Sequence, residues 1–369
     1  MVIVGIDSTP LRNPLTGGGR YALNIVRHFA EQPGVTLHFY GRKPDPSVTD
    51  EFSNVPLFEQ TQSNMMWYGI RLPALLKRNQ CMGYWGFPLP FRRVQGTVYV
   101  TSILDLYFLK LPHVEQWSRM KRLITLRHRL LSYFATWQTL KTADHVLTLS
   151  KATQEDLRHY FHNGVSDIVP PAPDITLSTP AQSSSAPDIP YILAVGGFQP
   201  YRNRERLIRS FALALSQHKC SMRLIIAGNF ESVQQRMCYE ALCRELKVDS
   251  HVEFFTGATD GQLAMLYRHA HGVIHPTLCE GFGMPVVEAL AFGKPIVVST
   301  AGAVPEAAGG LELMQFNPLD IDEMAESISL LFHVSVATPD EIRARTEYAQ
   351  SFSWSAAGDA TARRLINTI

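Results

Sequence analysis

Short apolar runs rich in β-branched residues alternate along the chain with longer stretches of helical spacing. The runs cover residues 2–6, 96–100 and 145–149 in the first half, and 191–195, 222–227, 252–255, 272–275 and 295–298 in the second. The helical stretches between them include 21–30, 151–161, 203–215, 233–246 and 260–270. Strands that are apolar throughout and separated by helices predict parallel sheets with helices on both faces.

A proline-rich segment interrupts this pattern near the middle of the chain. Residues 170–190 contain six prolines and a run of three serines, a composition typical of a linker. We expect an N-terminal Rossmann-like domain at 1–170, a linker at 171–190 and a C-terminal Rossmann-like domain at 191–352. A chain of 369 residues is long enough for two such domains. The predicted fold class is therefore α/β, with two doubly wound parallel-sheet domains facing a cleft.

Composition limits the partners and the location of the protein. The formal net charge of +1 provides no overall field that would attract a nucleic acid. The five cysteines are odd in number and scattered, as in a reduced cytoplasmic protein. No basic segment precedes the apolar run at 2–6, and no run approaches the ~18 apolar residues of a membrane-spanning helix. We expect a cytoplasmic protein that is soluble or peripheral to a membrane.

Three glycines, Gly17, Gly18 and Gly19, lie between the first strand and the first helix. Because they have no Cβ atoms, the backbone can approach a ligand closely there, and the following helix offers N–H groups to an anion. The same residues would also suit a flexible turn that binds nothing. Their spacing differs from the glycine fingerprint of dinucleotide-binding proteins.

The segment Glu-Gly-Phe-Gly-Met-Pro-Val-Val-Glu follows the strand predicted at 272–275. Its Pro285 suits the first turn of a helix, and Gly293 suits the end of that helix. The amides around Gly283 and Met284 would then form a helix N-terminus, which attracts an anion without a metal.

Two carboxylates, Glu280 and Glu288, flank this expected anion site. An ionised glutamate accepts hydrogen bonds, so the hydroxyls of a sugar and of a ribose would suit both positions. The alternative is a capping glutamate and a surface glutamate without a ligand.

Arg202 follows the strand predicted at 191–195 and a glycine turn. A guanidinium group can hold a diphosphate through two N–H groups. An arginine in such a turn can also be solvated, but its place on the same predicted domain as Glu280 and Glu288 favours the phosphate role.

Together these segments resemble glycosyltransferase family 4, the retaining transferases with the two-domain GT-B fold. The clearest similarity is the pair Glu280 and Glu288, which fits the family's motif of two glutamates separated by seven residues. Further similar segments are 16–21, 146–150, 266–277, 293–298, 304–309 and 317–320.

The resemblance implies a nucleotide-sugar donor, with no metal and no prosthetic group. It implies that Glu288 binds the ribose, that Glu280 holds the donor sugar, and that segment 353–369 is a helix crossing back onto the first domain. The implied donor-binding residues are Gly17, Gly18, Arg202, Gly281, Phe282, Gly283, Met284 and Glu288, and the implied catalytic residues are Glu280, Arg202 and Asp105.

Two positions depart from the family pattern. The family often has a His-Asp pair after a central strand of the first domain, whereas here Leu104 stands at the histidine position and only Asp105 remains. Leucine cannot donate a hydrogen bond to a sugar hydroxyl. Arg202 stands where a lysine is usual, and it keeps the positive charge.

The resemblance implies an enzyme, a hexosyltransferase that retains the anomeric configuration. Segment 200–204 and the glycine loop are similar to mannosyltransferases of bacterial surface polysaccharide assembly, which make O-antigen or capsule. We therefore expect GDP-mannose as the donor, with a UDP-sugar as the alternative, and a saccharide acceptor carried on a polyprenyl lipid. The rival hypotheses are a sugar-nucleotide epimerase or hydrolase on the same fold, and a non-catalytic protein that binds sugar nucleotides.

Apolar residues recur at helical spacing through residues 117–137, with basic residues and no acidic residue between them. The apolar set is Trp117, Met120, Leu123, Ile124, Leu130, Leu131, Phe134 and Trp137, and the basic set is Arg119, Lys121, Arg122, Arg127 and Arg129. This pattern is typical of a helix on an anionic membrane surface, such as the inner face of the cytoplasmic membrane. It also suits a helix packed on the core with a solvated basic face.

Overall fold

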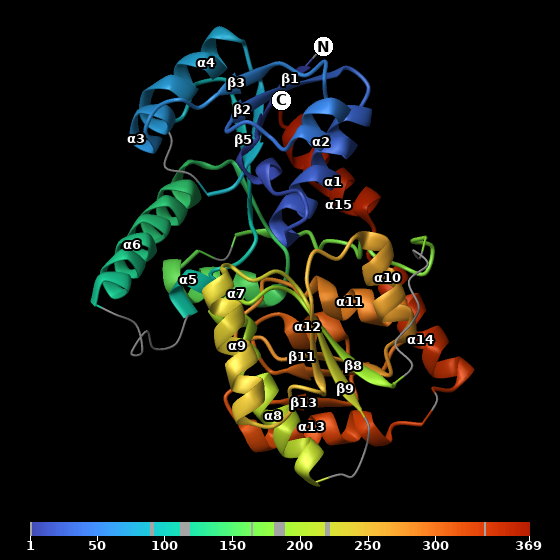
Figure 1. Cartoon of the computed structure of the whole chain (residues 1–369). Helices are drawn as coiled ribbons and strands as arrows, with labels where there is room; N and C mark the ends of the chain where they lie inside the picture. Colours follow the sequence, from blue (N-terminus) through green and yellow to red (C-terminus); the bar gives the residue numbers. More distant parts are fainter. Residues whose placement is uncertain are drawn as a thin grey trace. The chain divides into compact units, whose positions relative to one another are not determined.

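The structure, a computed structural model, describes residues 2–88, 92–110, 119–163, 165–180, 189–217, 222–335 and 337–369, with only the backbone at 65, 119–126 and 128. Contacts between Cα atoms divide the chain into two units. Unit 1 comprises Met1–Pro171 with Ser353–Ile369, and unit 2 comprises Ala172–Phe352. Each unit is built around one sheet of strands (Figure 1).

Unit 1 contains a seven-stranded sheet in the order β3-β2-β1-β4-β5-β6-β7, in which all neighbouring strands are parallel. The strands are β1 (Val2–Asp7), β2 (Val35–Gly41), β3 (Leu57–Glu59), β4 (Gly83–Gly86), β5 (Val98–Ile103), β6 (His145–Thr148) and β7 (Asp167–Ile168). The helices are α1 (Gly17–Glu31), α2 (Pro46–Glu51), α3 (Asn64–Met66), α4 (Leu72–Arg78), α5 (Tyr107–Lys110), α6 (Arg119–Thr142), α7 (Lys151–Phe161) and α15 (Trp354–Ile366).

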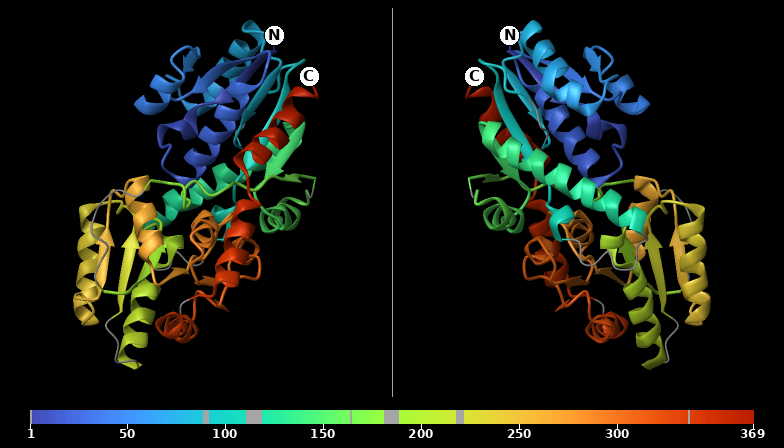
Figure 2. Two further views of the ribbon diagram at one scale, coloured as in Figure 1. Left: turned by 90° about the vertical axis from the view of Figure 1, so that its right-hand side faces the viewer. Right: turned by 90° about the vertical axis from the view of Figure 1, so that its left-hand side faces the viewer.

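The last helix, α15, lies against α1 although more than 300 residues separate them in the sequence (Figures 1 and 2). The imidazole of His28 on α1 lies 2.9 Å from the carboxylate of Asp359 on α15. Beside this pair, Gly358 lets the two helices approach, because a Cβ at that position would lie 2.2 Å from the ring of His28. At the other end of α15, Arg364 forms a 2.7 Å ion pair with Asp167 of β7.

Unit 2 contains a six-stranded sheet in the order β10-β9-β8-β11-β12-β13, again with parallel neighbours throughout. The strands are β8 (Tyr191–Val195), β9 (Arg223–Ala227), β10 (Val252–Phe255), β11 (Gly272–His275), β12 (Ile296–Ser299) and β13 (Met314–Phe316). The helices are α8 (Arg204–Gln217), α9 (Val233–Glu245), α10 (Asp260–His269), α11 (Met284–Ala291), α12 (Val304–Ala308), α13 (Ile321–His333) and α14 (Pro339–Gln350).

The predicted fold class, two Rossmann-like α/β domains with parallel sheets, is confirmed. The central strands β8, β11 and β12 are buried along their whole length, as continuous apolar runs require. Residues from one face of this sheet, such as Ile192 and Val297, form a hydrophobic core with α8 and α13.

Two segments differ from the sequence-based expectation. Helix α1 begins at Gly17 rather than near Tyr21, because Thr16 acts as its N-cap and accepts a hydrogen bond from the Gly19 amide at 3.2 Å. In the segment expected to be a linker, Ala172 and Ile175 are buried, while residues 181–188 lie outside the described part of the chain.

The stretch at 117–137 falls largely on α6, although residues 117 and 118 lie outside the description. Where side chains are described, α6 exposes Leu130, Leu131, Phe134 and Trp137. Among the described residues, no helix combines the length and the apolar composition that crossing a membrane requires.

Replacing Gly358 with alanine should destabilise unit 1, because the new Cβ would collide with His28. Overpacking of this kind costs about 1–3 kcal/mol. The five tryptophans, Trp67, Trp85, Trp117, Trp137 and Trp354, all belong to unit 1, so urea unfolding followed by tryptophan fluorescence reports on that unit.

Gly69→Ala is the matched control for this experiment. Gly69 also lies in a helical segment of unit 1, but nothing stands within 4 Å of its Cβ position. We expect its free energy of unfolding to stay the same or to rise slightly. Equal stability of the two variants would contradict the close packing of α15 on α1.

Candidate functional site

The strand order of unit 2 reverses between β8 and β11, which are neighbours in the sheet. Doubly wound sheets bind ligands at such a switch point, beyond the carboxyl ends of the strands. Arg202 ends the short helical turn (Pro200–Arg202) that follows β8, and Glu280 lies in the loop that follows β11. The order of the strands thus brings together two side chains that are 78 residues apart in the sequence.

Hydrogen bonds fix the two loops to each other. Asn203 has a left-handed backbone (φ +59°), which asparagine tolerates better than most residues. Its side-chain amide donates to the carbonyls of Pro276 at 3.0 Å and Pro318 at 2.6 Å. The hydroxyl of Thr277 donates to the carbonyl of Tyr201 at 2.9 Å. The segment that carries Arg202 is therefore held in place from both sides.

Arg202, Glu280 and His275 form one cluster with little exposure to solvent. A guanidinium nitrogen of Arg202 forms an ion pair with Oε1 of Glu280, and Nε2 of His275 lies 3.3 Å from the same oxygen. The three side chains are 18%, 14% and 2% exposed, respectively. The cluster is thus partly open at Arg202 and Glu280 and closed at His275.

The electrostatics of the cluster keep Glu280 ionised. Burial acts to raise the pKa of Glu280, but the charge of Arg202 and the close contact with His275 outweigh burial, so its pKa lies below the usual value. Burial lowers the pKa of His275 and is the largest influence on it, so this imidazole is neutral near pH 7. Glu280 is consequently a charged acceptor held by a guanidinium group.

Helix α11 begins directly after the loop of Glu280. Gly283 is its N-cap, with a backbone φ of +110° that a residue with a side chain rarely adopts, and Pro285 stands in the first turn. The preceding Phe282 is buried and packs edge-on against Phe352, with ring centroids 5.3 Å apart. The N-terminal amides of α11 therefore lie next to Glu280, in a position to interact with an anion.

Glu288 lies one turn inside α11 and is only 5% exposed. Its Oε2 accepts a hydrogen bond of 2.8 Å from the hydroxyl of Tyr267 on α10. The ring of Tyr267 stacks on Phe292, which restricts its position. Glu288 is therefore a buried carboxylate with a fixed orientation. The alternative hypothesis from the sequence, that it is a surface glutamate, is wrong.

In unit 1, the predicted glycines lie at the start of α1. A Cβ at Gly18 would stand 3.2 Å from Cδ1 of Leu104, whereas the Cβ position of Gly17 is open. Gly18 thus lies beside Leu104, the residue at which the sequence resemblance led us to expect a histidine. At Gly19 a Cβ would overlap the carbonyl of Asn13, so this position requires glycine for packing alone.

Asp105 also belongs to unit 1, in the loop between β5 and α5. Its carboxylate accepts a hydrogen bond of 3.1 Å from the backbone N–H of Tyr107, at the start of α5. This contact gives Asp105 a local structural function, independent of any reaction.

Four residues of the unit 2 site were not singled out from the sequence: Asn203, Arg204, Tyr267 and His275. His275 carried a weak signal, because it is a polar residue that closes an otherwise apolar strand. The hydrogen bond of Tyr267 had no local signal, because its partner lies 21 residues away on another helix.

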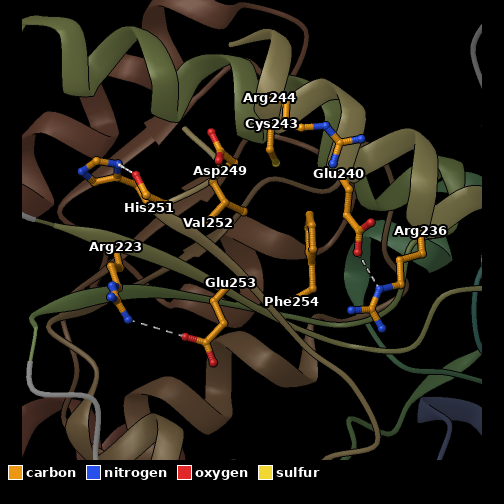
Figure 3. A pocket seen from close by; sticks show the side chains of 11 residues that line it. Arg223, Arg236, Glu240, Cys243, Arg244, Asp249, His251, Val252, Glu253 and Phe254 are labelled. Atoms are coloured by element: carbon orange, nitrogen blue, oxygen red, sulfur yellow. Dashed lines mark hydrogen bonds and ion pairs between the residues drawn. The ribbon is translucent and has the colours of Figure 1, made fainter. Parts of the chain in front are cut away.

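A separate surface pocket of about 470 Å³ lies along the edge strand β10 (Figure 3). Its charged side chains largely pair with one another, Arg236 with Glu240 at 2.8 Å and Arg223 with Glu253 at 4.0 Å. None of the predicted site residues lines it, and β10 is two strands away from the β8–β11 switch point at its nearest. This pocket is therefore not part of the candidate site.

Comparison with known proteins gives consistent matches. Residues 178–350 match the family model of glycosyl transferases group 1. The O-antigen chain mannosyltransferase B of Escherichia coli is 24% identical over 350 residues, which are 86% of this chain and 87% of that protein. The MMP alpha-(1->4)-mannosyltransferase of Mycolicibacterium hassiacum is 37% identical over 122 residues, which are 31% of this chain and 29% of that protein.

The fold has solved counterparts as well. The structure of WaaG, a glycosyltransferase involved in lipopolysaccharide biosynthesis, superimposes on this chain with a TM-score of 0.71 at 18% sequence identity. The superposition covers 99% of this chain and 99% of WaaG. At this identity the match concerns the fold, which is that of the GT-B glycosyltransferases. The chain is a glycosyltransferase with the GT-B fold, and residues 178–350 carry its similarity to glycosyl transferases group 1.

Proposed function

We propose that this glycosyltransferase transfers a hexose with retention of the anomeric configuration, from a nucleotide-sugar donor bound at the switch point of unit 2. The observation that carries the proposal is the Arg202–Glu280 pair, which lies next to the N-terminus of α11 and is backed by His275. A positive charge, a helix N-terminus and an ionised acceptor together suit a ligand that has both a diphosphate and hydroxyl groups.

The positive groups would act on the leaving diphosphate. As the bond between the anomeric carbon and the phosphate oxygen breaks, negative charge grows on that oxygen. Arg202 and the amides around Gly283 and Met284 would stabilise this charge, which is the task of a divalent metal in other transferases. We therefore propose that the reaction requires no metal.

The two glutamates would hold the two hydroxyl-bearing ends of the donor. Glu280 would accept hydrogen bonds from the transferred sugar, and the backbone amides of Phe282, Gly283 and Met284 would donate hydrogen bonds to it. Glu288, oriented by Tyr267, would accept hydrogen bonds from the ribose. Gly17 and Gly18 would suit contact with a diphosphate, because the absence of side chains allows close approach.

The acceptor proton needs no separate base in this scheme. The acceptor oxygen would bond to the anomeric carbon on the face that the diphosphate leaves, and the departing phosphate oxygen would take the acceptor proton. Asp105 remains a candidate contact to the sugar or acceptor, beyond its hydrogen bond with Tyr107. Leu104 cannot contribute, since it has no polar group.

The proposed donor is GDP-mannose, and the proposed acceptor is a saccharide on a polyprenyl lipid, in the assembly of a surface polysaccharide. Support for both comes from the similarity to an O-antigen chain mannosyltransferase along most of the chain. A UDP-sugar is the alternative donor.

Helix α6 would bring the enzyme to such an acceptor at the cytoplasmic face of the membrane. Leu130, Leu131 and Phe134 are each at least half exposed, an unusual group for a single helix of a water-soluble domain. Arg127 is exposed nearby, and the Lys141 ammonium lies 3.9 Å from the ring centroid of Trp137. Apolar and cationic side chains in one segment suit an anionic membrane surface.

Glu280→Ala and Arg202→Ala should each lower kcat by about 10²–10³-fold, the usual loss when a group that stabilises transition-state charge is removed. The measurement is release of nucleoside diphosphate in the presence of saccharide acceptors, with the anomeric configuration of the product followed by NMR. Arg209→Ala is the control, since Arg209 is a surface arginine paired with Glu205 on α8. Near-normal turnover in both site variants would refute the assignment.

Glu288→Gln should abolish the preference of the protein for ribonucleotides. In a thermal-shift screen of GDP, UDP and their sugars, binding to the folded state raises Tm by mass action. For the wild-type protein, we expect removal of the 2′- or 3′-hydroxyl of the preferred nucleoside diphosphate to weaken its binding about tenfold. The Gln variant should bind the ribose and deoxyribose forms alike. Undiminished discrimination in the variant would exclude Glu288 as the ribose ligand.

Binding to vesicles should depend on α6 and on lipid charge. The protein should cosediment with vesicles that contain phosphatidylserine more than with neutral vesicles, and salt should weaken the binding. Phe134→Ser should reduce it, whereas Val233→Ser, a change at a more exposed apolar residue of α9, should not. Equal binding to both kinds of vesicle at low salt would contradict the membrane proposal.

A further inference from the structure

Arg204, the first residue of α8, is one of the largest side chains that the structure buries completely. Burying a guanidinium group is costly unless its N–H groups are hydrogen-bonded and its charge is balanced. Among the described residues, no carboxylate forms an ion pair with Arg204, and its hydrogen bonds go to backbone carbonyls. Its burial therefore calls for an explanation other than a salt bridge.

The guanidinium group turns back to the end of strand β8. Its Nη2 donates to the carbonyl of Gly196 at 2.7 Å, and its Nε donates to the carbonyl of Gly197 at 3.2 Å. These two glycines form the turn that leads from β8 to Arg202. Arg204 consequently fixes the backbone conformation of this turn.

The glycine turn is the point where two guanidinium groups meet. A Cβ at Gly196 would lie 3.2 Å from Nη2 of Arg204 and 3.3 Å from Cζ of Arg202. Gly196 also has a φ of +116°, so both backbone strain and space exclude a side chain there. The turn is therefore shaped to accommodate two positive charges close together.

The charges around Arg204 do not cancel. Arg202 lies on the same segment, the neutral His275 ends β11, Glu280 comes from the loop after β11, and Tyr239 comes from α9. Burial and the nearby Arg202 lower the pKa of Arg204 to about 9, which still leaves it charged at pH 7. Two cations therefore face one carboxylate, and this small buried region has a positive surplus that an anion would neutralise.

We propose that Arg204 is a positioning residue of the donor-phosphate site, which holds the Gly196–Gly197 turn in place and supplies a second buried positive charge for a nucleoside diphosphate. This inference rests on the proposed function and adds a residue to it. Arg204 would act on the diphosphate of the donor and of the leaving group, and it would not contact the base or the sugar.

The test compares ligands that differ only in charge. Nucleoside, nucleoside monophosphate and nucleoside diphosphate are titrated calorimetrically into the full-length protein, for both guanine and uracil. Arg204→Met removes the charge but keeps an unbranched apolar side chain. We expect it to weaken diphosphate binding by at least about tenfold and nucleoside binding much less, because only the phosphates respond to the lost charge.

Two further variants complete the comparison. Arg209→Met removes the same charge from the exposed face of α8 and should leave all three affinities unchanged. Arg204→Lys keeps the charge but cannot reproduce both carbonyl contacts, so it should lose only about threefold in diphosphate affinity. If the Met variant does not fold, the Lys variant still tests the proposal, since its loss must be confined to the diphosphate.

The outcomes separate the inference from the proposed function. A wild-type protein that binds no nucleoside diphosphate would refute the proposed function, and the inference with it. Suppose instead that the wild-type protein binds the nucleotide more tightly with each added phosphate, and that the Arg204 variants show the same increase. This result would refute the role of Arg204 alone. Equal weakening of all three ligands would also overturn it, because a purely structural residue would have that effect.

Discussion

The side chain of Asn203 joins three loops of unit 2, and the geometry of the site depends on it. Asn203 follows β8, and the carbonyls that it binds follow β11 and β13. Its left-handed backbone turns the amide toward both of them. The adjacent Arg202 and Glu280 are thus positioned by neutral hydrogen bonds. Their own ion pair would be a weaker support, since the desolvation of buried charges offsets much of their attraction.

Within this framework the site carries a charge imbalance. Arg202 and Arg204 lie close together at the glycine turn, and Glu280 is the carboxylate that faces them. Such an arrangement makes the folded protein less stable than an apolar core would. Reduced stability of this kind is common at ligand-binding sites. A bound diphosphate would supply the missing negative charge.

The sequence predicted the strands whose apolar runs are continuous. The bounds expected for β8, β10 and β11 agree with the structure to the residue. Strands β2, β3, β4, β7 and β13 were missed. β2 contains the polar residues Thr36 and His38, and β4 begins and ends with glycine, which has little preference for strands. These segments become strands because neighbouring strands pair with them, so local sequence carries little signal.

For the site, the sequence alone determined what is local. Seven residues separate Glu280 from Glu288. Pro285 marks the start of a helix between them, and Gly293 marks its end. A helix N-terminus flanked by two carboxylates therefore follows from short-range chemistry. Only the tertiary structure decided which partners these groups meet. His275 and Arg202 contact Glu280, Tyr267 orients Glu288, and Arg204 is buried beneath the glycine turn. The physical reason is that strand order and helix packing set these contacts. The residues adjacent in the chain to each of these side chains determine neither the strand order nor the packing.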